Sequence, residues 1–337
     1  MVTGIISNMK RRQLLELSAK SVLATLAIGF ASKSNAKPTL RTGLVLDDAF
    51  LNHHINAKHP ESPARYQAIK QHIIANDLAN KTMPIVPKND AEQWLSLIHS
   101  PQHIAAIKTW QRRKHNNAVL ATAGVLAAVD AVCNKQVENA FCASRPPGHH
   151  ARNTGQEEGF CYYNHIAIAA KYAQQQYNRK KILIIDWDYH HGDGTEWAFY
   201  SDPSVLYFST HDMFAYPGTG FPSRIGEGEG EGFNINVHLD CGSNDEDIIS
   251  AFKNKLLAAA EAFKPDLILI SAGFDSRQDD LLGCFEISNN GYIILTRMVK
   301  TIANKHCHGE MVSMLEGGYN LEGNASAVTA HITTLLE

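Results

Sequence analysis

The sequence lacks an excess of charge of either sign, and it lacks closely spaced cysteine pairs. Its 337 residues include 31 lysines and arginines against 34 aspartates and glutamates, which gives a formal net charge of −3. This balance argues against a protein that binds nucleic acid through phosphate contacts. The six cysteines contain no C-x-x-C pair. In a chain of this length they therefore predict neither a disulfide framework nor a cysteine-ligated metal site.

The N-terminal segment lacks an apolar run long enough to span a membrane, which needs about 20 residues. It has instead a basic patch at Lys10–Arg12, an apolar run of 11 residues at 21–31, and the small residues Ser34-Asn35-Ala36. This order is typical of a signal peptide, and Arg11-Arg12 followed by Gln-Leu-Leu resembles a twin-arginine signal. We therefore expect residues 1–36 to be a signal peptide and the protein to be exported, with a periplasmic location.

Alternatives remain open for this segment. It could form an amphipathic helix or an uncleaved anchor, translation could start at Met1 or at Met9, and an unused signal would leave the protein in the cytoplasm. Cleavage after Ala36 would remove five basic residues and one acidic residue, which leaves a net charge of −7 and no stable membrane span. An acidic mature surface suits cationic substrates better than nucleic acid.

Internal repeats, proline-rich linkers and long charge runs are absent after Pro38, so we expect residues 37–337 to form a single domain. Short apolar segments with β-rich composition alternate with helical patterns. This alternation predicts an α/β fold with a mostly parallel sheet covered by helices on both faces, and ligand sites at the carboxyl ends of the strands. The expected strands are 40–46, 140–143, 181–187, 204–209, 232–239, 266–271 and 310–315. The expected helices are 62–76, 121–133, 164–177, 245–263, 289–303 and 325–336.

Histidine, in contrast, is abundant: the chain has 17, and histidine is both the commonest metal ligand and a frequent general base. In ILIIDWDYHHGDG (182–194) a predicted strand runs directly into Asp186, Asp188 and His190. Side chains at alternate positions of a strand point to the same side. A loop with polar caps does not explain this alternation, so the segment predicts a metal or catalytic site.

A second strand, in DLILISAGFD (266–275), ends near Asp275. Taken alone, a carboxylate after such a strand is more often a turn or cap residue. Together with Asp188 and His190, however, Asp275 completes an Asp-His-Asp set that leaves a position open for water. That is the pattern of a catalytic rather than a structural zinc site.

Two further motifs offer acid–base chemistry. His149 and His150 follow a predicted strand and a rigid Pro-Pro-Gly turn, and in LEGGYN (315–320) a Gly-Gly turn is expected to place Tyr319 over the same sheet edge. A tyrosine hydroxyl there could donate to a developing oxyanion. Either motif alone is also compatible with a surface loop. Histidines buried beside a metal need carboxylate partners, and Asp186 and Asp193 are available for that role.

Taken together, these motifs resemble the zinc-dependent histone deacetylase family. They are RPPGHHA (145–151), EGFCYYNH (158–165), DWDYHHGDGTE (186–196), PGTG (217–220), SAGFD (271–275) and LEGGYN (315–320), in the family's order. HPESPARY (59–66) and the FD pair at 274–275 resemble the class II branch and its bacterial relatives. The resemblance covers roughly residues 40–337. It implies the three-layer arginase/deacetylase α/β fold, with about eight mostly parallel strands in the central sheet.

The resemblance also implies an activity, the removal of acetyl or other acyl groups from lysine side chains by metal-activated water. The implied ligands of one zinc ion per chain are Asp188, His190 and Asp275. The implied catalytic residues are His149 and His150, backed by Asp186 and Asp193 respectively, and Tyr319. Which histidine acts as base and which as acid stays open.

The implied substrate tunnel is lined by Gly159, Phe160, Tyr216 and Leu282. A structural potassium ion is implied as well, held by Ser209 and by the backbone carbonyls of Asp186, Asp188 and His190. The expected partner is an acylated lysine in a peptide or protein, or an acetylated small amine.

The sequence departs from the family at several positions. Tyr216 stands where the family usually has phenylalanine, and His165 follows Asn164 where asparagine or aspartate is usual. Leu282 is apolar where polyamine-selective relatives carry an acid, which favours acyl-lysine over acetylpolyamine. The segment 110–120 is too short for the loop that often contacts the peptide backbone. Arg277 cannot ligate a metal, which argues against an arginase-like binuclear manganese hydrolase.

Two other functions stay open: an acetylpolyamine or other small-molecule amide deacetylase, and a non-catalytic protein that binds acyl-lysine or metal. The sequence leaves the acyl chain length and the oligomeric state undetermined.

Overall fold

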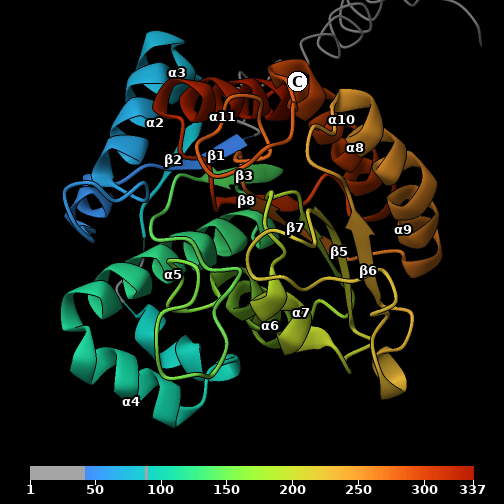
Figure 1. The fold of residues 1–337 in the computed structure, drawn as a ribbon, viewed down its shortest axis with the longest axis horizontal. Helices are drawn as coiled ribbons and strands as arrows, with labels where there is room; N and C mark the ends of the chain where they lie inside the picture. The colour runs from blue at the N-terminus through green and yellow to red at the C-terminus, as the bar shows by residue number, and fades with distance from the viewer. Residues whose placement is uncertain (1–41, 88–89) are drawn as a thin grey trace, which may run out of the picture. The chain divides into compact units, whose positions relative to one another are not determined.

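The computed structural model describes residues 42–87 and 90–337, so the predicted signal peptide lies outside the described residues. The described chain contains one eight-stranded sheet with the strand order β2-β1-β3-β8-β7-β4-β5-β6, and all neighbouring strands are parallel (Figure 1). The strands are β1 Thr42–Val45, β2 Met83–Ile85, β3 Asn139–Cys142, β4 Ile182–Asp186, β5 Val205–His211, β6 Asn234–His238, β7 Leu267–Ala272 and β8 Met311–Leu315.

Helices cover both faces of the sheet (Figure 1). On one face α11 packs against α2 and α10, and on the other α5 packs against α4 and α6. The helices are α2 Pro63–Ala75, α3 Leu78–Lys81, α4 Pro101–Trp110, α5 Arg112–Cys133, α6 His165–Tyr177, α7 Asp193–Phe199, α8 Asp245–Ala251, α9 Leu257–Phe263, α10 Asn289–His306 and α11 Leu321–Leu335. A π-helical turn, Phe252–Leu256, makes α8 and α9 continuous.

The predicted three-layer α/β fold is confirmed, and seven of the eight strands overlap the expected segments. The local structure differs from the expectation in several elements. The edge strand β2 and the helices α3, α4 and α7 were not predicted. The helix expected from residue 121 begins instead at Arg112, so most of the segment 110–120 is helix rather than loop. It folds this way because His115 and Ala118 are buried on the face that α5 turns to the protein interior.

Helix α5 is also the one helix in the described chain that is long and apolar enough to cross a membrane. Most of its apolar stretch is buried within the protein, and it packs against β1, β3 and β8 as well as its helical neighbours. These contacts are those of a core helix.

The cysteine expectation needs a correction. Cys241 and Cys284, 43 residues apart, form a disulfide, because the segment after β6 and the loop after β7 run side by side: the Gly242 amide donates to the Cys284 carbonyl at 2.8 Å. The other four cysteines are free, and three of them are buried.

The sheet order explains why distant motifs meet. β3, β8, β7 and β4 are consecutive neighbours, and all run in the same direction. The residues that follow them therefore leave the sheet at one edge. Those residues are the tandem histidines after β3, Tyr319 after β8, Asp275 after β7, and Asp188 with His190 after β4.

Candidate metal centre and active site

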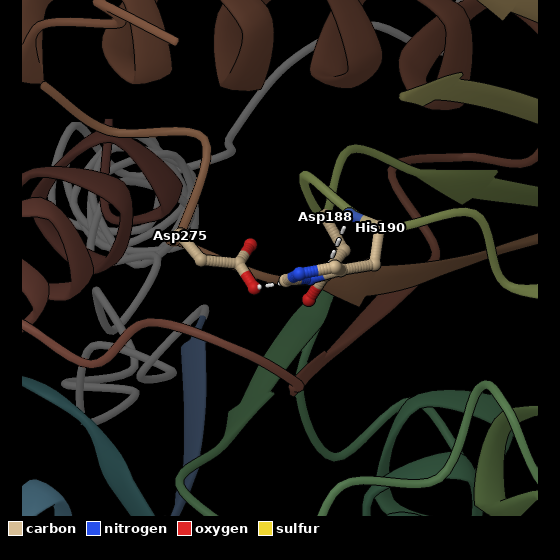
Figure 2. Close-up of side chains that lie close together, drawn as sticks. All are labelled: Asp188, His190 and Asp275. Atoms are coloured by element: carbon tan, nitrogen blue, oxygen red, sulfur yellow. Dashed lines mark hydrogen bonds and ion pairs between the residues drawn. The ribbon is translucent and has the colours of Figure 1, made fainter. Parts of the chain in front are cut away.

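Asp188, His190 and Asp275 bring one ligand atom each to within 4.8 Å of one another, in a cluster that is buried at both carboxylates. Figure 2 shows the three side chains pointing toward a common centre. His190 Nδ1 lies 3.2 Å from Asp188 Oδ1 and 3.0 Å from Asp275 Oδ2. Within the described ranges it is the sole cluster of three or more such ligands.

One oxygen of each carboxylate accepts a hydrogen bond from a backbone amide of a neighbouring segment. The Gly317 amide donates to Asp188 Oδ2 and the Tyr189 amide to Asp275 Oδ1, each at 2.8 Å. A Cβ atom at Gly317 would collide with both carboxylates, so only glycine lets the chain approach this closely. The remaining oxygens are consequently aimed at the centre of the cluster.

The electrostatics of the cluster fit a divalent cation. Burial and the neighbouring charge of Asp188 raise the pKa of Asp275 to about 7. Burial lowers the pKa of His190, but hydrogen bonds to both aspartates raise it to about 10. Two buried carboxylates thus face a single imidazole, and a bound cation would balance their charge. Two carboxylates and one imidazole, with room for a further ligand, suit catalytic zinc.

The two tandem histidines each have a buried carboxylate partner. His149 Nδ1 lies 3.0 Å from Asp186 Oδ2, and His150 Nδ1 lies 2.9 Å from Asp193 Oδ1. Their rings are 4.0 Å apart between centroids. A carboxylate at Nδ1 fixes the tautomer and leaves Nε2 of each ring for proton transfer.

The pKa values of these two histidines are driven apart. Burial would lower the pKa of His149, but the charges of Asp188 and Asp186 raise it well above the usual value. Burial and the neighbouring His149 lower the pKa of His150 to about 3. One ring is therefore suited to hold a proton while the other is neutral, which is the arrangement that acid–base catalysis needs.

Tyr319 is nearly buried, and its backbone is held firmly. The amides of Tyr319 and Asn320 donate to Asp280 Oδ2 at 2.7 and 3.0 Å, and the Arg65 guanidinium lies over the Tyr319 ring, 4.9 Å from its centroid. Burial raises the pKa of the Tyr319 hydroxyl well above 10, although Arg65 opposes this shift. The hydroxyl therefore remains a hydrogen-bond donor at neutral pH.

Glu316 is a buried carboxylate that the sequence patterns did not single out. Its Oε2 accepts the Gly148 amide at 2.6 Å, and its Oε1 accepts the Ser271 hydroxyl at 3.1 Å. Burial raises its pKa to about 7. It ties the turn before the tandem histidines to β7 and β8. The signal that could have singled out Glu316 is its position directly after a predicted strand. An acid at such a position is, however, also typical of a turn.

Three of these residues, His150, His190 and Tyr319, line a pocket of about 530 Å³. We call the floor of the pocket these three residues together with Asp188, Asp275 and His149, which contact them. We call its rim Glu157, Tyr216 and Leu282. Of the tunnel residues that the family resemblance implied, all four line the pocket: Gly159, Phe160, Tyr216 and Leu282. Sequence reasoning missed three lining residues, Glu157, Tyr189 and Ala215.

Ser209 lies on β5 directly opposite Asp186 of β4. Its hydroxyl lies 2.8 Å from His211 Nδ1. The potassium site expected at Ser209 stays a prediction.

The departures from the family pattern have structural explanations. The Asn164 side chain accepts from the Ala167 amide at 3.0 Å and so caps α6, while His165 is buried with its Nδ1 2.8 Å from the Thr122 hydroxyl. Arg277 donates to Asp279 at 2.5 Å and to Asn289. Its side chain is thus bound outside the metal cluster.

Comparison with known proteins agrees with this geometry. The model of the histone deacetylase domain matches residues 59–335. The chain belongs to the histone deacetylase family. It is 37% identical over 325 residues to histone deacetylase 15 of Arabidopsis thaliana and 36% identical over 305 residues to the polyamine deacetylase HDAC10 of Mus musculus. These alignments cover 90% and 82% of this deacetylase-family chain, but 58% and 45% of the two relatives.

The crystal structure of the HDA15 HD domain superposes on this deacetylase-family chain with a TM-score of 0.82 at 36% sequence identity, and the match covers 88% of both chains. At this identity the shared fold and the shared family agree with each other.

Proposed function

We propose that this member of the histone deacetylase family is a zinc-dependent amidohydrolase that removes acetyl or other acyl groups from lysine side chains. One observation carries the proposal. A donor set for a catalytic metal, two histidine–aspartate pairs and a buried tyrosine hydroxyl converge at the floor of a single pocket.

The roles of the chain's own residues follow from their positions. When bound at Asp188, His190 and Asp275, zinc would polarise the amide carbonyl and acidify a water molecule. One of the tandem histidines accepts a proton from the attacking water, and one gives a proton to the leaving amine nitrogen as the C–N bond breaks. The Tyr319 hydroxyl donates to the carbonyl oxygen as negative charge develops there. The products are a carboxylate and a free amine.

Two observations support a single metal ion per chain. The described residues hold one cluster of ligands, and Arg277 is bound to Asp279 and Asn289 rather than facing a second site. An arginase-like binuclear hydrolase would need a further carboxylate here. Measuring the metal content of the purified protein tests this point, and two equivalents of metal per chain would contradict it.

The walls of the pocket favour an acyl-lysine side chain. Phe160, Tyr216 and Leu282 offer apolar surface in the pocket lining, which suits the methylene chain of lysine. The alternative is a small acetylated amine, because one relative is named a polyamine deacetylase.

The decisive experiment is a turnover screen of the purified protein on acetyl-lysine peptides, longer acyl-lysine peptides and acetylspermidine. We expect turnover that a chelator abolishes, that zinc restores and that a hydroxamate inhibits. A protein that holds one zinc ion per chain but hydrolyses none of these substrates would instead be a binding protein.

We also propose that residues 1–36 direct export. The Cys241–Cys284 disulfide supports this proposal, because disulfides persist mainly in oxidising compartments. In cells that make the full chain, changing Arg11 and Arg12 to lysine should move the protein from the periplasmic to the cytoplasmic fraction. An unchanged distribution would count against a twin-arginine signal.

A further inference from the structure

Glu157 is the one carboxylate among the side chains that line the rim and walls of the pocket. The rest of the lining, above the histidines of the floor, is made of aromatic and aliphatic groups, a glycine and an alanine. Glu157 is partly exposed, and its carboxylate is the one negative charge that a ligand would meet in this lining. The proposed chemistry at the floor does not use Glu157.

The backbone around Glu157 forms a tight turn. Glu158 and Cys161 exchange two backbone hydrogen bonds, of 3.0 and 2.8 Å, across Gly159 and Phe160, which have φ angles of +52° and +70°. Positive φ at both central positions is the pattern of a type I′ turn. Glu157 Oε1 accepts the Phe160 amide at 2.6 Å. One carboxylate oxygen is therefore used to hold the turn.

The other oxygen of Glu157 is free for a ligand. Across the described residues, no cationic side chain pairs with this carboxylate. Its neighbour Glu158 is different: it accepts from the Arg152 backbone amide at 3.0 Å and from Arg152 Nε at 2.9 Å, and it does not line the pocket. Two adjacent acids thus differ, since one is neutralised by an arginine and the other faces the pocket with its charge unopposed.

The segment that carries Glu157 is anchored by two buried histidines. His103 accepts the Gly155 amide at 3.0 Å through Nδ1 and donates to the Tyr162 carbonyl at 2.8 Å through Nε2. His99 accepts the Asn164 amide at 2.8 Å. The carboxylate is therefore presented at a fixed place and does not depend on a loose loop.

Glu157 also lies close to the reacting centre. A Cβ atom at Gly159 would press against the His150 ring and the Tyr216 ring. Glu157 is two residues earlier in the chain, a distance of at most about 7 Å between Cα atoms. A positive charge a few bonds beyond the scissile amide nitrogen could thus reach the carboxylate.

We propose that Glu157 is a specificity-determining residue that binds a second positive charge on the amine half of the substrate. This inference rests on the proposed deacetylation. The chemistry recognised is an ammonium or guanidinium group a few bonds from the scissile amide. It could belong to an acetylated diamine or to a basic residue next to an acetylated lysine, and apolar surroundings strengthen the attraction in either case.

Matched substrates test this proposal. One pair is an acetyl-lysine peptide flanked by arginine and the same peptide flanked by glutamine, and the other is N-acetyl-1,4-diaminobutane and N-butylacetamide. We expect the native protein to prefer the cationic member of at least one pair by about three- to tenfold in kcat/KM, as for a partly exposed ion pair. The preference should decline as salt is raised, because salt screens this attraction. A preference within only one pair identifies the source of the cation.

Glu157→Gln is the informative variant, because its amide oxygen can still accept the Phe160 N–H while the charge is gone. It should raise KM for the cationic substrate by about the same factor, leave kcat unchanged and leave the neutral substrate unaffected. Glu158→Gln is the matched control and should keep the preference.

The outcomes separate this proposal from the proposed function. If Glu157→Gln slows both members of each pair equally, Glu157 only shapes the turn and the proposal is wrong. Neutral substrates that are hydrolysed as fast as cationic ones would also overturn it, while leaving deacetylation intact. If the native protein hydrolyses none of the four substrates and no other acylated amine, the proposed function itself fails.

Discussion

At the floor of the pocket, Asp188 and Asp275 are fully buried, and each of their four carboxylate oxygens has a hydrogen-bond partner within the chain. At the rim, Tyr216 is 50% exposed and Leu282 is 39% exposed. The floor is assembled from four neighbouring strands, so the fold itself specifies it. The rim is made of loop residues: Glu157 is held by its turn, whereas Tyr216 and Leu282 are exposed. The contrast teaches that, if the proposed function holds, the reaction and the choice of substrate are encoded in parts of the molecule that differ in burial.

The largest effect should come from a metal ligand at the floor. Asp188→Asn keeps the shape of the side chain and an acceptor for the Gly317 amide, but it replaces a charged ligand with a neutral one. We expect loss of bound zinc and a fall in turnover of at least about 10³-fold. Metal analysis and steady-state kinetics measure both, with thermal unfolding as the control for folding. A variant that keeps its zinc and its turnover would show that the cluster is not the metal site.

The next effect in size concerns the Tyr319 hydroxyl. Tyr319→Phe removes one donor and keeps the ring under Arg65, so zinc content should stay unchanged while kcat falls by about 10²–10³-fold. Kinetics on a neutral acetyl-lysine peptide measure this loss. If turnover is unchanged, the hydroxyl is not part of the reaction, and the floor reduces to the metal and the histidines.

The floor shows how far sequence reasoning reached. Asp188 and His190, which stood out by their alternation after a predicted strand, lie with Asp275 in the one cluster of candidate metal ligands among the described residues, and their roles stay a prediction. Glu316 and Asp280 could not be assigned, because their roles are to accept backbone amides from segments distant in the chain. No local pattern encodes such a contact.

Two elements of the fold, strand β2 and helix α4, were also not predicted, and the reasons differ. Strand β2 has three residues, one of them Pro84, which a central strand would not tolerate; it forms because it lies at the edge of the sheet. Helix α4 was also missed, although Ser100 caps its first turn through the His103 amide and Pro101 begins it. That signal was present in the sequence, whereas the edge position of β2 was not.

A third prediction concerns His99, which holds the segment behind the pocket through the Asn164 amide. Burial and the neighbouring His103 lower the pKa of His99 to about 3, so in the folded protein this ring stays neutral while in the unfolded chain it titrates near 6.5. Below pH 6.5 the unfolded chain binds the proton and the native state does not. Stability is therefore present above pH 6.5 and declines by up to about 1.4 kcal/mol per pH unit as the pH falls toward 3.

Thermal or urea unfolding between pH 7.5 and pH 5 measures this slope. Other buried histidines, such as His165 and His331, also have a pKa lowered to about 3 and add to the slope. His99→Gln removes one of these titrating groups and should therefore reduce the slope by up to about 1.4 kcal/mol per pH unit, even though it lowers stability at neutral pH. An equal slope in both proteins would assign the acid sensitivity to the other buried histidines.

The smallest effect is expected at the rim. The ring of Tyr216 packs edge-on against His150 at 4.9 Å between centroids, and no described residue bonds to its hydroxyl. Tyr216→Phe restores the residue usual in the family and should change kcat/KM on an acetyl-lysine peptide by less than about threefold, as for most exposed substitutions. A much larger change would mean that this hydroxyl contacts the substrate. The difference between floor and rim in their effect on turnover would then be smaller than their difference in exposure suggests.

The disulfide has a practical consequence for anyone who handles this protein. Cys284 Sγ lies 3.1 Å from the hydroxyl of Tyr189, a pocket residue, and Leu282 is two positions away along the same loop. No cysteine belongs to the metal cluster. A stock kept with a thiol reductant and one kept without it would therefore share the same floor of the pocket but differ in how the loop at the rim is held. Substrate preferences measured on the two stocks should not be pooled.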